Sequence, residues 1–149
     1  MKVKAVNEWL SLVANLGVLL GIVVLIFELN QNTRITQITA YQDVVENITN
    51  LNSMILTDPD VARLRMEELS GAQLSEIDEQ RYAAYYRMLL RQSELAYTQY
   101  ENGFIDRNMV RRALNPLLDH TNRSGSAARR WENSRESWPE FYEFVNSFR

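Results

Sequence analysis

The longest stretch without a charged side chain limits what this chain can fold into. It lies between Glu8 and Glu28 and reads WLSLVANLGVLLGIVVLIF. As an α-helix, residues 9–29 would measure roughly 30 Å, which is the thickness of the hydrocarbon core of a bilayer. Trp9 stands where an aromatic side chain anchors a helix at the membrane interface. The stretch therefore predicts a transmembrane helix over residues 9–29, preceded by a short tail at residues 1–8.

Two other roles fit the same stretch less well. A cleaved signal peptide has a shorter apolar core, of about 7–15 residues, and small residues at its cleavage site. Here the sequence FELNQ follows, which makes a poor cleavage site. A core helix of a soluble protein would need apolar partners on all its sides, and the remaining chain is too short to supply them.

The flanking cations favour one direction for the membrane helix. Lys2 and Lys4 precede it, whereas only Arg34 follows it closely. Because cytoplasmic flanks carry the excess of positive charge, this distribution favours an N-terminus inside and a soluble domain outside. The difference in count is small, so the side of the soluble domain stays open.

Small residues form a stripe along the predicted membrane helix. Ala14, Gly17, Gly21 and Val24 share one face, and the two glycines form a GxxxG pair. Small side chains let two helix backbones approach closely in lipid, where packing drives association. The stripe predicts a helix–helix contact between copies of the chain, although glycine is also simply common in membrane helices.

Polar side chains mark other positions on the same helix. Ser11 and Asn15 lie about a third of a turn from the glycine stripe, and Glu28 falls on that stripe at the membrane edge. Asparagine in lipid needs a partner, so Asn15 either bonds a neighbouring helix or faces water. One hypothesis is a homo-oligomeric pore or ion channel, with Ser11 and Asn15 toward the lumen and Glu28 at its mouth. A carboxylate that extends to the interface is the simpler account of Glu28.

The segment that follows predicts a continuation of the same helix. No glycine or proline occurs between Gly21 and Pro59, so we expect a helical extension over residues 30–57. Its flanks carry few charges, which predicts that other protein covers it. Its apolar positions recur near helical spacing and are Ile35, Ile38, Val45, Ile48, Leu51 and Ile55.

Residues 58–149 predict a small helical soluble domain. Asp58-Pro59 is typical of a helix start, and Ser70-Gly71 is typical of a stop. The predicted fold class is all-α: one N-terminal transmembrane helix that extends into a long amphipathic helix, followed by this domain. The next helix is expected over 76–101, begun at Ser75 and ended by Asn102-Gly103. A further helix is expected over 106–118, with Pro116 disturbing its end. A polar loop at 122–127, a helix over 128–135 and a last helix from Pro139 would complete the domain.

Aromatic residues recur in this domain at helical spacing. They could line a cavity, which gives a further alternative function, a small-ligand sensing domain. Stripes of this kind are far more often part of a core, and we expect a core here. The residues are Tyr82, Tyr85, Tyr86, Tyr97, Tyr100, Trp131, Trp138 and Phe141.

The composition excludes most catalytic chemistry. There is no cysteine and only one histidine, so one chain holds neither a thiolate site nor a multi-histidine metal site. His120 stands in the sequence LDHT, far from any nucleophile motif, and we interpret it as a surface or capping residue. No glycine-rich phosphate loop occurs. We therefore expect no enzymatic activity, no cofactor and no metal.

Charge is distributed unevenly along the soluble domain. The net charge of −3 argues against a nucleic-acid partner. Residues 58–79 are mostly acidic and residues 107–135 mostly basic, so the two segments could pair, although a solvated surface of mixed sign is the simpler account. The basic segment could also bind anionic head groups or an acidic partner. The candidate residues are Arg107, Arg111, Arg112, Arg129 and Arg130.

Three motifs resemble a large family of uncharacterised bacterial single-pass membrane proteins. The first is ELNQNTR at residues 28–34, after the hydrophobic helix. The second is YTQYENGFID at residues 97–106, and the third runs from RWE at 130–132 through WPEF at 138–141. The resemblance implies a bacterial membrane protein without an established activity, and it transfers no catalytic residue.

The favoured function from sequence is therefore not enzymatic. We expect a single-pass protein of the bacterial inner membrane that contacts lipid. It would self-associate or act as a structural subunit of a membrane complex.

Overall fold

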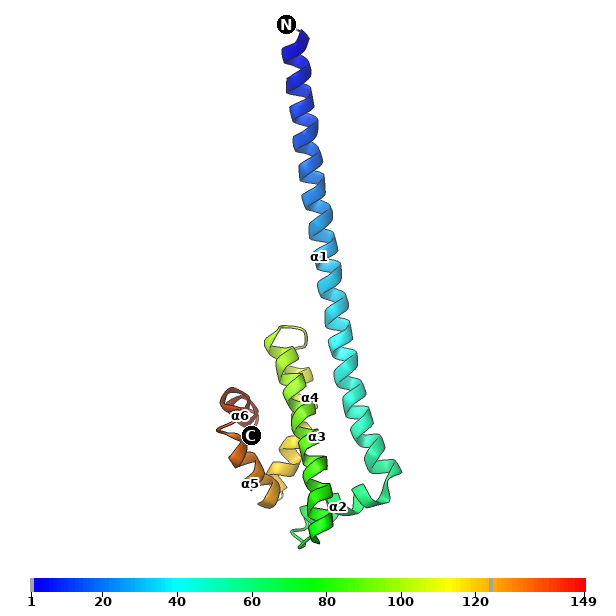
Figure 1. Cartoon of the computed structure of the whole chain (residues 1–149), viewed down its shortest axis with the longest axis vertical. Coiled ribbons are helices and arrows are strands. Elements are labelled where there is room, and N and C mark those ends of the chain that lie inside the picture. Colours follow the sequence, from blue (N-terminus) through cyan, green and yellow to red (C-terminus); the bar gives the residue numbers. More distant parts are fainter. Residues whose placement is uncertain (1, 124) are drawn as a thin grey trace. The chain divides into compact units, whose positions relative to one another are not determined.

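The structure is a computed structural model that describes residues 2–123 and 125–149, with side chains from residue 7 onward (Figure 1). Within these residues helices joined by short turns and loops make up the fold and no strand occurs, which confirms the all-α prediction. Contacts divide the chain into two units, Met1–Ile38 and Thr39–Arg149. The helices are α1 (Lys2–Thr57), α2 (Pro59–Leu69), α3 (Glu76–Glu101), α4 (Arg107–Arg123), α5 (Gly125–Ser134) and α6 (Pro139–Asn146).

The first unit consists of the N-terminal part of α1. Every described side chain from residue 7 to residue 38 is exposed. Polar side chains in this part bond the helix itself: the Thr33 hydroxyl donates to the carbonyl of Leu29 at 2.9 Å, and that of Thr36 donates to Asn32 at 3.0 Å. No tertiary contact is needed to satisfy these hydroxyls, because the preceding turn supplies the acceptor.

The second unit begins with the C-terminal part of α1, which packs on the domain core. Its buried residues are Ala40, Val44 and Leu51, one or two turns apart. Val44 and Leu51 border the same small gap as Leu89 of α3 and Ala113 of α4, so this part of α1 lies against both helices. The predicted face was partly wrong: Leu51 is buried, but Ile35, Ile38 and Val45 are exposed. The prediction relied on the large apolar side chains, and isoleucine is more hydrophobic than alanine. The face that carries Ala40 is buried because the other helices of the domain pack on it, which the sequence of α1 alone does not show.

Local capping chemistry sets the ends of α2 and α3, as predicted. The Asp58 carboxylate accepts hydrogen bonds from the backbone N–H groups of Asp60 at 2.9 Å and Val61 at 3.3 Å. The Ser75 hydroxyl accepts from Asp78 N–H at 3.2 Å and so caps α3. These bonds satisfy donors that the first turn of a helix leaves free. Gly103, with φ of 71°, adopts the left-handed conformation that ends α3.

The core of the second unit lies where α3 packs on α4 and α4 packs on α5 (Figure 1). Trp131 of α5 has no exposed surface, and its indole N–H donates to Asn146 Oδ1 at 3.1 Å. Its ring lies 5.0 Å from that of Tyr142 and 5.7 Å from that of Phe141 of α6. The interpretation of the aromatic positions as core is confirmed for the five that are buried: Tyr82, Tyr85, Tyr86, Trp131 and Phe141.

The prediction for α4 and the segment after it was wrong in two places. Helix α4 continues past Pro116 to Arg123. Proline inside a helix costs about 3 kcal/mol, and burial of Leu117 and Leu118 beyond it, at about 1.5–3 kcal/mol each, offsets that cost. The polar loop expected at 122–127 is mostly helical, because α5 begins at Gly125 and fully buries Ala127.

Replacement of the central indole tests this core. We expect Trp131→Ala to lower the free energy of unfolding by about 3–5 kcal/mol, because it leaves a large cavity and an unpaired Asn146 amide. Chemical denaturation of the full-length protein in detergent, followed by near-ultraviolet circular dichroism, measures the change. Leu56→Ala is the control: Leu56 is 84% exposed, so its truncation should cost less than about 0.5 kcal/mol. Equal effects of the two variants would contradict the assigned core.

Candidate functional site

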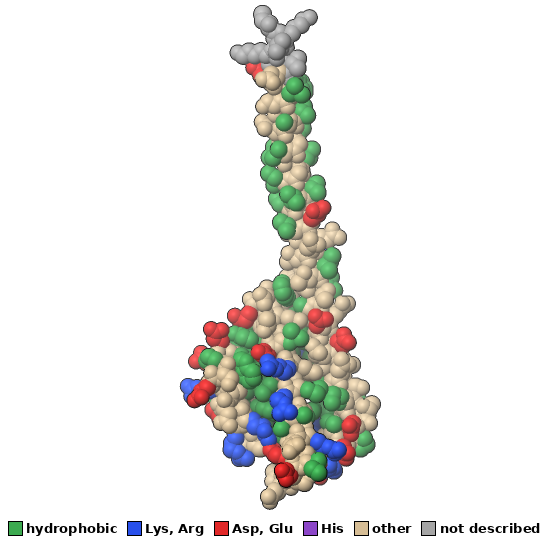
Figure 2. Space-filling view, viewed as in Figure 1, with side chains coloured by type: hydrophobic (Ala, Val, Ile, Leu, Met, Phe, Trp, Pro, Cys, Tyr) green, Lys and Arg blue, Asp and Glu red, His purple; other side chains and the backbone are tan. Residues whose placement is uncertain are grey.

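The apolar part of α1 is the first candidate site. Among the described helices, α1 is the one that is long and apolar enough to cross a membrane, and none of its apolar stretch is buried inside the chain. Trp9 and Phe27, at its two ends, are each 70% exposed. Figure 2 shows hydrophobic side chains along this segment. The core helix of a soluble protein is mostly buried, whereas the described side chains of this stretch are all exposed.

The predicted contact residues of this helix all lie on its open surface. Ala14, Gly17, Gly21 and Val24 are exposed, and a Cβ atom added at either glycine would meet no atom within 4 Å. The glycines are therefore not required by any packing within the described chain. Ser11, Asn15 and Glu28 are exposed as well. Their roles as helix contacts, lumen residues or pore mouth stay predictions.

The five predicted anion-binding arginines do not form one free cluster. Arg130 pairs with Glu79 of α3, and the Arg107 guanidinium lies 4.7 Å from the ring centre of Phe148. Arg111 and Arg112 are exposed at the start of α4, and Arg129 lies next to Gly125 on α5. The Arg130–Glu79 pair links the basic and acidic segments within one chain. Binding of an anionic partner by the other arginines stays a prediction.

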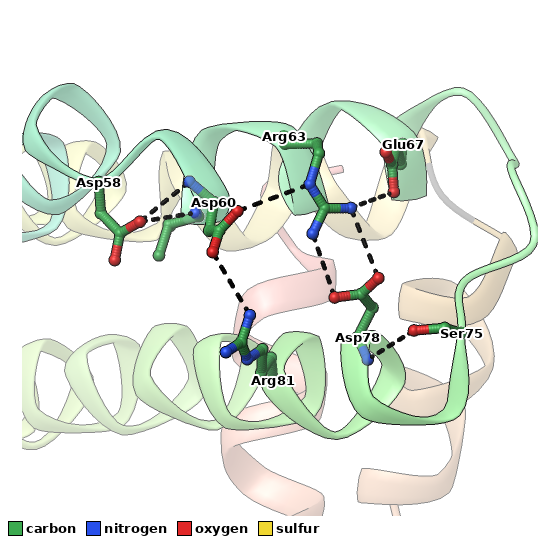
Figure 3. A network of polar contacts seen from close by, with 8 residues as sticks. Asp58, Asp60, Arg63, Glu67, Ser75, Asp78 and Arg81 are labelled. Carbon is green, nitrogen blue, oxygen red and sulfur yellow. Dashed lines mark hydrogen bonds and ion pairs between the residues drawn. The ribbon is translucent and has the colours of Figure 1, made fainter.

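An ion-pair network joins α2 to α3 (Figure 3). The Arg63 guanidinium donates to both oxygens of Asp78, at 3.1 and 3.5 Å, and to Glu67 Oε2 at 2.9 Å. Arg81 of α3 reaches back to Asp60 Oδ2 of α2 at 3.4 Å. Hydrogen bonds from Arg63 are the main cause that lowers the pKa of Asp78 below its ordinary value of 3.8. The same contacts raise the pKa of Arg63, so both groups stay charged at neutral pH.

Beside this network lies a cavity of about 330 Å³. Met54 of α1 borders it, together with Leu64 and Arg65 of α2 and Tyr85 and Met88 of α3. The volume is at the lower end of the range for small-ligand pockets, and most of the lining is apolar. Arg65 and Tyr85 are the polar residues of greatest interest here, because each carries a buried polar atom, Nε and the hydroxyl, that makes no hydrogen bond of acceptable geometry among the described residues.

His120 lies behind the cavity and is fully buried, so its interpretation as a surface or capping residue was wrong. Its ring centre lies 5.6 Å from that of Tyr85 and 6.5 Å from that of Tyr82. Nδ1 lies 3.0 Å from the carbonyl oxygen of Pro116 and therefore carries the hydrogen, because a carbonyl can only accept. Burial is the main cause that lowers the pKa of His120 below 6.5, so the ring is neutral.

Sequence reasoning did not single out Arg65, although a signal for it exists. Val61, Leu64, Arg65 and Glu68 recur at helical spacing, and all four are at least partly buried. When charged residues are counted in the helical repeat, Arg65 falls on the inner face of α2. The search for apolar residues alone excluded it.

The Asp78–Arg63 contact predicts acid-dependent stability. Because folding lowers the pKa of Asp78, the ionised form stabilises the domain above about pH 4, and this contribution is lost as pH falls through the lowered pKa. We expect Asp78→Asn to lower the melting temperature at about pH 7, and the difference from the wild type to shrink at about pH 2. Thermal melts at both pH values measure it, with the exposed Asp43→Asn as control. A difference that stays constant across this range would exclude the contact as its source.

Comparison with known proteins identifies a family for the chain. Residues 15–148 match a family described as "Domain of unknown function (DUF4760)". No curated protein and no solved structure that was compared matches the chain. The family match begins inside the apolar stretch of α1 and continues to the penultimate residue, so it includes the stretch from residue 15 onward, the ion-pair network and the cavity. The chain therefore belongs to the DUF4760 family, whose description names no activity.

Proposed function

We propose that this protein is a single-pass membrane protein, not an enzyme, whose N-terminal helix holds a small helical domain at the bilayer and associates with further copies. The observation that carries the proposal is the exposed apolar surface of α1 between Trp9 and Phe27. Soluble monomers rarely expose apolar patches larger than a few hundred Å². Lipid covers such a helix at no cost to its backbone, because all hydrogen bonds lie within the helix.

Location and direction extend this proposal. The motifs at residues 28–34 and 97–106 support a bacterial inner membrane, through their resemblance to bacterial membrane proteins. Lys2 and Lys4 before the apolar stretch, against Arg34 after it, support a cytoplasmic N-terminus. The domain that begins at Thr39 would then face the outside.

Self-association is supported by the open glycine face. Gly17 and Gly21 meet no side chain of their own chain, and with Ala14 they leave a shallow strip along the helix. In lipid such a strip lets a second backbone pack closely. The partner in the proposal is the same strip of another copy.

Membrane insertion has a direct test in a bacterial host. We expect the full-length chain to stay in the membrane pellet after extraction with alkaline carbonate. The double variant Val18→Arg and Val23→Arg should move to the soluble or aggregated fraction, because each arginine near the centre of a membrane helix costs about 2.5–3.5 kcal/mol. Val18→Leu with Val23→Leu is the matched control and should stay in the pellet. A wild-type chain that is soluble and monodisperse without detergent would refute the proposal.

Self-association has a separate test. We expect light scattering in mild detergent to give a multiple of the chain mass for the wild type. Gly17→Ile with Gly21→Ile should shift the protein toward one chain, because the branched side chains keep the backbones apart. The control is Leu16→Ile with Leu20→Ile, which also introduces two isoleucines but on the neighbouring face of the helix. It should leave the mass unchanged. An unchanged mass for the glycine variant would exclude the strip as the contact.

A further inference from the structure

We propose that the cavity between α1, α2 and α3 binds a small monocarboxylate with an apolar body, with Arg65 and Tyr85 holding the carboxylate. This site is independent of the membrane anchor, because all its residues lie in the unit Thr39–Arg149. The cavity volume of about 330 Å³ has room for about ten non-hydrogen atoms, at roughly 30 Å³ for each water-sized group.

The charges around the cavity point to an anion at Arg65. Asp58 uses its carboxylate to cap α2, and Asp60 pairs with Arg63 and Arg81. These charges are therefore already neutralised by local partners. Arg65 differs, because the carboxylate it pairs with, Asp119, is 3.6 Å away and lies closer, at 2.7 Å, to Arg123.

Hydrogen-bond capacity points to the same place. Arg65 Nε is buried and makes no hydrogen bond, and Tyr85 is only 7% exposed. The Arg65 side chain interacts with the Tyr85 oxygen, which leaves the hydrogens of Arg65 Nε and of the Tyr85 hydroxyl without an acceptor. A buried donor without a partner is costly, so a ligand that brings an acceptor to this part of the cavity would gain free energy. A carboxylate supplies two acceptor oxygens and a negative charge to a planar guanidinium, which is the pairing that arginine favours.

The positive charge of Arg65 acts on the interior behind the cavity. It opposes the rise in the pKa of Tyr85 that burial causes, and it adds to the fall in the pKa of His120. Both groups therefore lie within the field of the Arg65 guanidinium. An anion in the cavity would face this field, whereas an ammonium group would be repelled by it.

The remainder of the lining favours an apolar body. Met54, Val61, Leu64, Ala84 and Met88 border the cavity from three helices. Unbranched methionine side chains adapt to ligands of varied shape. An aryl or short alkyl group of the ligand would pack against these residues once the carboxylate is held.

Calorimetric titration of phenylacetate tests the proposal, because phenylacetate has ten non-hydrogen atoms and little tendency to enter lipid. The full-length protein is reconstituted in nanodiscs of zwitterionic lipid, with empty nanodiscs as the blank. We expect saturable binding of one phenylacetate per chain. Phenylacetamide, which has the same shape without the charge, should bind at least about tenfold more weakly, because charged hydrogen bonds contribute about 1.5–3 kcal/mol.

Variants assign the binding to the cavity. Arg65→Gln should weaken phenylacetate binding by about tenfold or more, and Tyr85→Phe should weaken it by a few-fold while keeping the ring. Arg87→Gln, on the exposed side of α3, is the matched control and should bind as the wild type does. Ala84→Phe places a large ring in the cavity from an exposed position and leaves Arg65 and Tyr85 unchanged in sequence, so it should abolish binding even if Arg65→Gln proves unstable.

Three results would overturn the proposal. The first is the absence of saturable phenylacetate binding to the wild type, which would mean that the cavity holds water only. The second is equal affinity for phenylacetate and phenylacetamide. The third is binding that survives Ala84→Phe. None of these results bears on the membrane anchor, whose tests use the extraction and the mass of the full-length chain.

Discussion

An apolar surface that its own chain does not cover has to be covered by something else, and this requirement governs the N-terminal part of the molecule. From Trp9 to Phe27 the side chains point outward on every side of α1, with no charged residue between them. The backbone N–H and C=O groups bond one another within the helix, so they need no hydrogen-bond partner outside it. Its exposed apolar side chains would be covered by lipid in the proposed anchor and by a second helix in the proposed contact. The proposed anchor and the proposed glycine contact are two answers to this one requirement.

The second unit is stabilised differently. Its core is built from aromatic and aliphatic side chains of α3, α4, α5 and α6 around Trp131, and the C-terminal part of α1 adds Val44 and Leu51. The ion pairs between α2 and α3 are largely exposed, and such pairs contribute little to stability on average. They join α2 to α3 at one side of the cavity, while Val61 of α2 packs against the apolar core. This arrangement leaves the cavity that Arg65 and Tyr85 border.

Local chemistry explains which parts of the fold were predictable. The capping carboxylate of Asp58 and the glycine at position 103 act within a few residues, and the sequence alone predicted both boundaries. The course of α4 through Pro116 depends on the burial of Leu117 and Leu118, which is a property of the folded domain. The same holds for Ala40, because a small side chain shows its role only when another helix packs on it. The glycine contact stays a prediction from sequence. Tyr82 and Tyr85 were named as residues that could line a cavity and both border this one, whereas Arg65 was missed because the search considered apolar residues alone.

The neutral, buried ring of His120 makes the acidity of the surroundings relevant to this domain. An unfolded chain takes up a proton on this ring near pH 6.5, but the folded domain resists that proton, chiefly because the ring is buried. Stability that is fully present above pH 6.5 is therefore lost progressively as the pH falls below it. The cytoplasm of a cell is buffered near neutrality, whereas the outer face of a bacterium meets the pH of its habitat. In the proposed orientation, with the domain outside, this one imidazole would make the stability of the fold depend on the acidity of the habitat.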